Sequence, residues 1–294
     1  MRHFLLIPHL NIHNANAMSS PYTIGFPAMT AWMGAVHALQ RYLHQQGLTQ
    51  VNFKKIAVSC HQLNMQTYKG RSDFVHSMIG TSNPLTEEGE RPAFIEEARC
   101  HLCVSLLIEY NSLDKNIEEN SRFKELIDAH IPCMKWASGD LLSVKQVEEI
   151  PVNEDEEKSI ENAINKLMLG HVLIEQRDLM IESMKQGKDA LEALLDYLKV
   201  TYSAEQDSDG KVTWAHTRKT TGWLVPIAVG FHGITPLGKA KNQRDGHTPH
   251  RFAESVITLG KFIMPYRIAR LDDMLWEYHV DQEKNLYLCR QAAS

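Results

Sequence analysis

Amide, hydroxyl and imidazole side chains are concentrated in one short run near the start of the chain. Residues 11–20 read Asn-Ile-His-Asn-Ala-Asn-Ala-Met-Ser-Ser and come shortly after an apolar segment at residues 4–7. Such side chains hydrogen-bond to base edges and sugar hydroxyls. We therefore expect this run to be a loop that reads an RNA strand. The side chains expected to make the contacts are Asn11, His13, Asn14, Asn16, Ser19 and Ser20.

Charge is distributed unevenly along the chain. The first 72 residues contain no acidic residue but six Lys or Arg and six His, although the whole chain has a net charge of −5. Residues 73–210 carry 29 acidic against 13 basic residues, and residues 211–294 carry 12 basic against 7 acidic. If the two basic ends fold together, they form one face suited to a polyanion. Chance segregation of charge on a soluble protein is the alternative, because charge splits are common.

A second basic segment surrounds a glycine-rich stretch at residues 230–238. Seven Lys or Arg lie between Lys211 and Arg251 inclusive, and the one acidic residue there is Asp245. Glycines let a backbone approach phosphate closely and the basic side chains supply charge, although glycines also occur in plain hairpins. The residues expected to bind phosphate are Arg71, Lys239, Arg244, Arg251 and Arg267.

Motifs for catalysis and metal binding are absent from the sequence. There is no P-loop, no G-x-S-x-G elbow and no H-E-x-x-H helix. Cys100 and Cys103 are spaced like a metal knuckle, but on a strand they point to opposite faces, and no second Cys/His pair has zinc spacing. We expect no catalytic residue, metal or cofactor. The alternative is a ribonuclease in which His13 or His37 takes a 2′-hydroxyl proton.

The apolar segments indicate the elements that position these residues. Strands are predicted at 4–7, 53–63, 100–110 and 141–147, and helices at 27–46 and 121–130, with a long connection at 64–95. This β-α-β-β-α-β order is typical of the split βαβ, or ferredoxin-like, unit, whose open sheet face binds single-stranded RNA.

The remainder of the chain predicts an insertion and a return to the core. Helical spacing over 151–200 indicates two or three amphipathic helices with an acidic exposed face, suited to a protein partner or simply to water. Strands are predicted at 212–216, 222–231, 252–262 and 286–288, with a helix near 272–279. The predicted fold is α+β, with an RRM-like core at 1–150, a helical insertion at 151–210 and C-terminal strands at 211–294 that complete the core.

Cysteine usage and hydropathy favour a cytoplasmic protein. Five Cys are too few, and odd in number, for a disulfide scaffold, so reduced thiols are expected. We expect no signal peptide, because the N-terminal apolar run is short and interrupted by Pro8. No apolar run is long enough to span a bilayer.

Several distinctive runs resemble one known family. Residues 5–17 closely resemble the start of the Csy-two family, and the likeness continues at 25–27, 37–41, 83–85, 104–107, 222–227, 248–252, 259–260, 265–267 and 275–276. Residues 111–210 match poorly.

The resemblance implies a role in RNA-guided defence. Members of that family are the 5′-handle subunit of type I-F CRISPR surveillance (Csy/Cascade) complexes. They have a modified RRM-like (RAMP) fold with a helical insertion. They pair with the large subunit (Csy-one type), abut the backbone subunit (Csy-three type), meet target DNA through the complex and are not catalytic.

Three hypotheses follow for this chain. The first is a non-catalytic subunit that holds the 5′ handle of the CRISPR RNA. The second is a metal-independent endoribonuclease of the same fold superfamily that processes CRISPR RNA. The third is an assembly protein whose RNA contacts are incidental.

Overall fold

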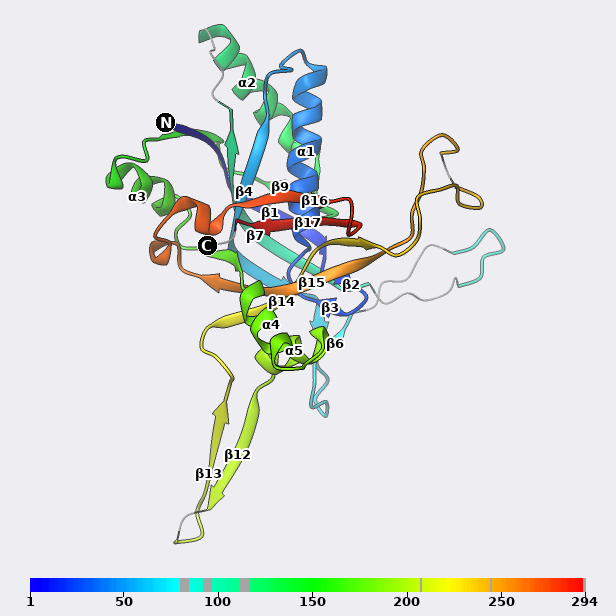
Figure 1. Ribbon diagram of the computed structural model, residues 1–294, viewed down its shortest axis with the longest axis vertical. Helices are drawn as coiled ribbons and strands as arrows, with labels where there is room; N and C mark the ends of the chain where they lie inside the picture. The colour runs from blue at the N-terminus through cyan, green and yellow to red at the C-terminus, as the bar shows by residue number, and fades with distance from the viewer. Residues whose placement is uncertain (80–84, 92–96, 112–116, 207, 244, 293–294) are drawn as a thin grey trace.

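One large antiparallel sheet dominates the computed structural model, which describes residues 1–79, 85–91, 97–111, 117–206, 208–243 and 245–292 (Figure 1). At its centre lie β4 (Phe53–Met65), β7 (Arg99–Tyr110) and β1 (Arg2–Asn16). Because β7 pairs antiparallel with both neighbours, β1 and β4 run in the same direction with β7 between them. The chain thus places β7 between two strands of the same direction, with α1 in the connection from β1 to β4.

Further strands extend the sheet on both sides of this centre. Beyond β4 follow, in order, β16 (Trp276–Asp281), β17 (Leu286–Gln291), β14 (Trp223–Gly233), β15 (Ala253–Ile263) and β11 (His171–Glu175). Beyond β1 lie β9 (Gly139–Ser143), β8 (Lys135–Trp136) and β10 (Glu148–Val152). Two-stranded ribbons outside the sheet are β2 (Met18–Ser20) with β3 (Thr23–Ile24), β5 (Thr67–Tyr68) with β6 (Ser77–Met78), and β12 (Thr201–Gln206) with β13 (Val212–Thr217).

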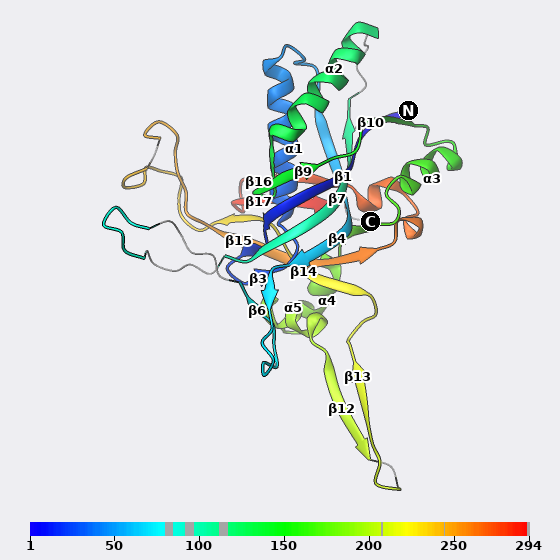
Figure 2. The ribbon, with the colours of Figure 1, turned by 180° about the vertical axis from the view of Figure 1, so that it is seen from behind.

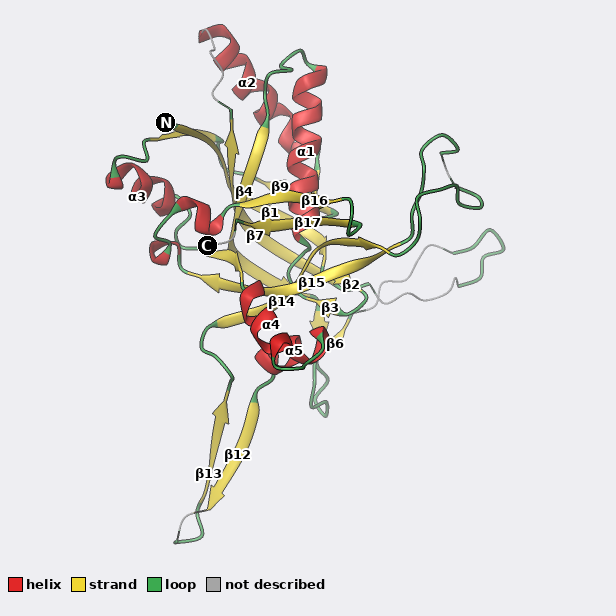
Figure 3. Cartoon of the chain, in the orientation of Figure 1, coloured by secondary structure: helices red, strands yellow, loops and turns green. Residues whose placement is uncertain are grey.

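The helices lie around the sheet (Figure 3). They are α1 (Met29–Gln45), α2 (Ile117–His130), α3 (Glu157–Asn165), α4 (Arg177–Lys185) and α5 (Ala190–Leu198), with short 3-10 turns η1 (Ile131–Cys133), η2 (Pro265–Arg267) and η3 (Leu271–Met274). No described helix is both long and apolar enough to cross a membrane.

The principal core forms where α1 packs on the central strands. Trp32, Val36, Leu39 and Leu43 recur at three- and four-residue steps and are buried against that face of the sheet. The helix ends at Gly47, whose φ of 92° allows the N–H of Gly47 to donate to the carbonyl of His44 at 3.0 Å. The prediction of a helix over 27–46 is confirmed to within two residues.

The predicted loop at residues 11–20 is wrong, because β1 continues through Asn16. Leu10, Ile12 and Ala15 are buried, whereas Asn11 and His13 point outward. The alternation is interrupted by register shifts between Ile7 and Leu10 and between Ile12 and Ala15. The bulges place the positive-φ residues His9 (52°) and Asn14 (56°) in the strand. An amide-rich run is therefore a half-buried strand, with its polar side chains fixed on one face.

The predicted helix near 272–279 is also wrong. The helical part is the single turn η3, and the chain then enters β16. Trp276 is buried and its Nε1–H donates to the carbonyl of Leu173 at 3.0 Å, while the following residues pair with β17. After the buried Trp276, half-buried and exposed side chains alternate along β16, and this strand pattern prevails over the helix-favouring acids before it.

Other predicted elements are confirmed with altered bounds. The strand predictions at 53–63, 100–110, 212–216, 222–231 and 252–262 correspond to β4, β7, β13, β14 and β15, and 286–288 lies in β17. The strand predicted at 141–147 ends earlier, at Ser143, and the connection predicted at 64–95 begins with the end of β4 and the β5–β6 ribbon. Residues 151–210 contain α3, α4 and α5, but also β11, which pairs with β15 and β4 of the main sheet. The α+β class with an antiparallel sheet is confirmed.

A second, smaller core covers part of the opposite sheet face. Phe4, Leu6 and Leu107 project there and are packed beneath α3 and η3, which contribute Ile164 and Met274. This cover ends partway along the strands, so the further course of β1, β7 and β4 on that face is open (Figure 2).

Candidate nucleic-acid interface

The open part of this face carries a continuous set of polar side chains, which we call the polar strip. They alternate with residues of the principal core, so they lie on the face away from α1. Cross-strand register aligns Asn11 with Cys103 and Gln62, and His101 with Asn64. The polar strip consists of His9, Asn11, His13, His61, Gln62, Asn64, His101 and Cys103. All eight side chains are exposed or half-buried.

The polar strip contains a pocket of about 320 Å³. Asn11, His13, Gln62, Asn64 and His101 line it, together with the end of β9 at Leu142 and Ser143. The Nδ2 of Asn11 donates to the hydroxyl of Ser143 in β9 at 2.7 Å, which fixes the orientation of the amide. Rigid strands therefore present amides and imidazoles around a hollow large enough for a planar group.

Two stacked histidine pairs form the centre of the polar strip. The rings of His9 and His61 lie 4.3 Å apart, and those of His13 and His101 are also 4.3 Å apart. The Nε2 of His61 is 2.7 Å from the hydroxyl of Ser105.

Their surroundings keep two of these histidines neutral. Burial lowers the pKa of His61 to about 4, and the neighbouring His9 and Lys145 add to the effect. Burial also lowers the pKa of His9. At neutral pH His9 and His61 therefore offer hydrogen bonds and ring faces, not charge.

Asn14 and Asn16 hold the end of the strip in place. The Oδ1 of Asn14 accepts from the Nε2 of Gln66 at 2.5 Å, and its main-chain N–H faces Nδ1 of His101 at 3.4 Å. The Oδ1 of Asn16 accepts from the N–H of Met18 at 3.0 Å. Both side chains are half-buried beside the strip, so one amide oxygen of each is already used within the protein.

Ser19 and Ser20 belong to the β2–β3 turn. Their hydroxyls lie 2.9 Å and 2.7 Å from that of Thr23, and the Ser20 hydroxyl also accepts from the N–H of Tyr22 at 3.1 Å. Ser20 is buried. The structure thus gives these hydroxyls a role in holding the turn, and the β2–β3 ribbon contacts β14.

Sequence reasoning missed the contribution of β4 and β7. Gln62, Asn64 and Gln66 alternate with Leu63 and Met65, which is the period of a half-buried strand, so a signal for them was present. No sequence pattern points to His101, because its place in the polar strip depends on stacking against His13, which is 88 positions away in the sequence.

The two basic ends of the chain meet, but through ion pairs. Arg2 contacts Glu109 at 2.7 Å, Glu154 at 2.9 Å and Asp272 at 3.1 Å. Lys55 lies 3.4 Å from Asp272. The charges of Arg2 and Lys55 are therefore neutralised at this junction instead of forming a shared basic face.

The predicted phosphate ligands lie in separate places. Arg71 is exposed in the turn between β5 and β6, and Lys239 and Arg251 lie in the loop between β14 and β15. Arg267 is in η2, which packs against α3 at the other end of β15, with its guanidinium 5.8 Å from the ring centroid of Tyr266. Arg244 lies outside the described residues.

The candidate ribonuclease histidines are not brought together. His13 belongs to the polar strip, whereas His37 is exposed on α1, which covers the other face of the sheet. Cys100 is buried in the principal core and Cys103 faces the strip, as strand geometry predicts. Burial raises the pKa of the Cys100 thiol to about 12. In the described part of the chain no group of three or more His, Cys, Asp or Glu is arranged to hold a metal ion.

Comparison with known proteins gives the class and then the family. A sequence model of the CRISPR-associated protein Csy2 family (Cas_Csy2) matches residues 5–289. The CRISPR-associated protein Csy2 of Pseudomonas aeruginosa (strain UCBPP-PA14) is 31% identical over 310 residues, which cover 96% of this chain and 93% of that protein. The chain is thus a CRISPR-associated protein. Within that class it belongs to the Csy2 family, and the predicted family resemblance is confirmed.

Proposed function

We propose that this chain is a non-catalytic subunit of a type I-F CRISPR surveillance (Csy/Cascade) complex and binds the 5′ handle of the CRISPR RNA. Its partners in this proposal are the large subunit (Csy-one type) and the backbone subunit (Csy-three type), with target DNA reached through the complex. The proposed setting is the cytoplasm. Membership of the Csy2 family supports the CRISPR context.

The polar strip is the observation that carries the RNA-binding part of the proposal. Single-stranded RNA is recognised by splayed bases that stack on rings and hydrogen-bond along their edges. The strip provides stacked imidazoles and the amides of Asn11, Gln62 and Asn64 on three rigid strands. Sites built on strands hold their geometry better than sites on loops.

The strand order supports an RRM-like (RAMP) fold for this proposal. β1, α1, β4, β7, α2 and β9 follow one another along the chain among the principal elements, and β9-β1-β7-β4 are neighbours in the sheet. α1 and α2 both contribute to the core on one face, which leaves the other face for RNA.

Co-purification of RNA tests the proposal. The full chain is co-expressed with its neighbouring subunits and a repeat-spacer RNA, purified through a tag on this chain, and the ends of the bound RNA are sequenced. A protected, uncut 5′ handle is expected with the wild-type chain. The triple variant Asn11→Ala, His13→Ala, Asn64→Ala should lose most of this protection. His37→Ala, an exposed histidine on the other face, is the matched control and should keep it.

Two outcomes would contradict this proposal, and each would favour a different function. Cleavage of the repeat by the purified chain alone, lost on His13→Ala, would instead favour the CRISPR-RNA-processing endoribonuclease. Assembly of the complex without any RNA protected by this chain would favour an assembly protein.

A further inference from the structure

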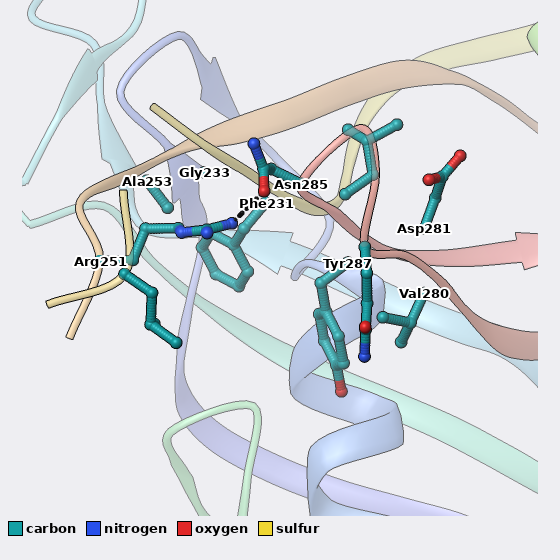
Figure 4. Close-up of a pocket in the computed structure, with 11 residues that line it drawn as sticks. Phe231, Gly233, Arg251, Ala253, Val280, Asp281, Asn285 and Tyr287 are labelled. Carbon is teal, nitrogen blue, oxygen red and sulfur yellow. Dashed lines mark hydrogen bonds between the residues drawn. The ribbon is translucent and has the colours of Figure 1, made fainter. Parts of the chain in front are cut away.

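A second hollow, which we call the Arg251 pocket, lies where β14 meets β15 and the β16–β17 hairpin (Figure 4). Its volume is about 510 Å³, and it shares no lining residue with the pocket of the polar strip. Strand register aligns Phe231 with Tyr287 and Tyr287 with Val280, so one row of apolar side chains crosses three strands. Phe231, Val280, Leu237 and Tyr287 are between 40% and 61% exposed.

Arg251 is held at the edge of this apolar row. Its side chain passes directly over Gly233, where an added Cβ would collide with the Cδ of Arg251. The guanidinium donates to the Oδ1 of Asn285, and the carbonyl of Asn285 accepts from the N–H of Gly233 at 2.8 Å (Figure 4). The hydrogen bond to Asn285 thus holds the arginine, and the missing side chain of Gly233 leaves room for it.

The charge of Arg251 is not used within the described part of the protein. No described carboxylate pairs with it, whereas nearby Asp281 is occupied by the N–H of Lys284 at 3.0 Å and by its Nζ at 3.4 Å. A buried or neutralised arginine would contribute to stability; a fixed and unpaired one is suited to an anionic ligand.

A smaller hollow adjoins the Arg251 pocket on the side of the β14–β15 loop. Its volume is about 250 Å³, and Arg251, Lys239, Thr235 and His250 are among its lining residues. Arg251 therefore separates an aromatic hollow from a cationic one. A nucleotide has the same division, with a planar base at one end and a phosphate at the other.

We propose that the Arg251 pocket binds one unstacked nucleobase of a single-stranded RNA, with the adjoining phosphate between Arg251 and Lys239. The base stacks on Phe231 and Tyr287, and the polar edge of the pocket at Asn285 and Gln282 faces its hydrogen-bonding groups. This inference rests on the proposed function, because the nucleotide belongs to the RNA that the polar strip holds. An apolar protein side chain would leave the fixed arginine without an anion, which is why a nucleotide is favoured.

Binding measurements with matched variants test the pocket. Fluorescence anisotropy of the full chain with a labelled 16-nucleotide single-stranded RNA should show about tenfold weaker binding for Phe231→Ala, since one stacked base is lost. The salt dependence of RNA binding by Phe231→Ala should be the same as that of the wild type. Arg251→Ala, in contrast, should flatten the salt slope by about one unit. Phe231→Trp should retain affinity because the ring is kept. Tyr202→Ala removes an exposed ring in the β12–β13 hairpin, away from both pockets, and serves as the control.

Ultraviolet crosslinking of the co-expressed complex gives a second readout. A nucleotide crosslinked to Phe231 or Tyr287, identified by mass spectrometry, is the expected result. Unchanged affinity of Phe231→Ala together with no crosslink in this pocket would overturn the inference. The proposed function would still stand if the polar-strip variant loses RNA, and would itself fail if the wild-type chain protects none. If Phe231→Ala recovers less of a partner subunit while its RNA affinity is unchanged, the inference about the Arg251 pocket is also overturned. The pocket would then be a contact site for that subunit.

Discussion

His61 shows how one side chain sets the chemistry of the polar strip. Its ring is half-buried, stacked on His9 and bonded to the Ser105 hydroxyl, and burial lowers its pKa to about 4. The unfolded chain should titrate near the ordinary value of about 6.5. Between these values the unfolded state binds more protons, so stability falls as the pH falls.

The first prediction follows from this loss of stability at low pH. Wild-type protein should lose on the order of 2 kcal/mol of unfolding free energy through His61 between pH 6.5 and pH 4. His61→Gln should remove this part of the pH dependence while leaving other groups to titrate. Urea unfolding at pH 7 and pH 4.5 measures the difference, and His37→Gln is the exposed control. An imidazole of His61 that titrates near 6.5 by NMR would contradict the prediction.

Arg2 is a single residue on which several segments converge. Its guanidinium contacts Glu109 of β7, Asp272 of η3 and Glu154 just before α3, and Arg2 and Glu109 are both largely buried by side chain. Removing one partner of a buried ion pair leaves an uncompensated charge, which is more costly than losing the attraction itself.

We therefore predict that Arg2→Ala destabilises the fold by about 3 kcal/mol. Urea unfolding measures the loss. The double variant Arg2→Ala, Glu109→Gln should recover part of it, because the stranded carboxylate is then gone. Lys54→Ala, which removes an exposed cation nearby in β4, is the control and should change stability little. Equal stability of Arg2→Ala and Lys54→Ala would show that the network contributes nothing.

At the scale of elements, the β12–β13 hairpin is set apart from the rest of the fold. Every residue of both strands is exposed, including Tyr202 and Trp214, and the hairpin projects away from the sheet (Figures 1 and 2). A two-stranded ribbon alone is marginally stable in water. Its strands bury none of the apolar surface that stabilises the sheet.

Replacing residues 202–216 with a short Gly-Ser linker should therefore leave the melting temperature within about 2 °C of wild type. Thr201 and Thr217 are paired partners, so a short linker can join them without moving the flanking elements. Thermal unfolding followed by circular dichroism makes the comparison. Trp276→Ala, which empties a fully buried site in β16, should by contrast cost about 4 kcal/mol. A fall of more than about 6 °C for the linker variant would show that the hairpin stabilises the core.

Elements with a clear hydrophobic periodicity were predictable from the sequence. Elements that depend on pairing between strands far apart in the sequence were not. α1, β4 and β7 have clear helical or strand patterns, and the structure contains them nearly as predicted. β1 was predicted to end early because its polar residues resemble a loop, and its bulges shift the alternation. In the site, Asn11 and His13 were predicted, but His101 was not, because β7 reaches β1 only through long-range pairing.

At the scale of the whole molecule, charge is organised differently from its order in the sequence. The N-terminal cations Arg2 and Lys55 are paired with acids that the sequence places far away. The strip itself is polar and not cationic. Two of the predicted phosphate ligands, Arg251 and Arg267, instead flank opposite ends of β15.

The separation of these two arginines predicts how binding depends on RNA length. β15 has 11 residues, so its ends are about 33 Å apart at the usual rise of a strand. Phosphates along one strand of duplex DNA are spaced about 3.4 Å apart on the axis, and at that spacing about ten nucleotides are needed to reach both arginines. A four-nucleotide RNA can contact one of them at most, and a 16-nucleotide RNA can contact both.

Anisotropy titrations over a range of salt concentrations measure this dependence. With the 16-nucleotide RNA, Arg251→Ala and Arg267→Ala should each flatten the salt slope by about one unit, and the double variant by about two. With the four-nucleotide RNA, the double variant should flatten the slope by no more than the more affected single variant. His37→Ala should leave both slopes unchanged. If Arg267→Ala has no effect on the longer RNA, the strand runs from the polar strip toward the β14–β15 loop alone, and Arg267 is not a phosphate ligand. If both arginines affect the four-nucleotide RNA equally, the two ends of β15 cannot be separate points of contact, and the path along that strand is wrong.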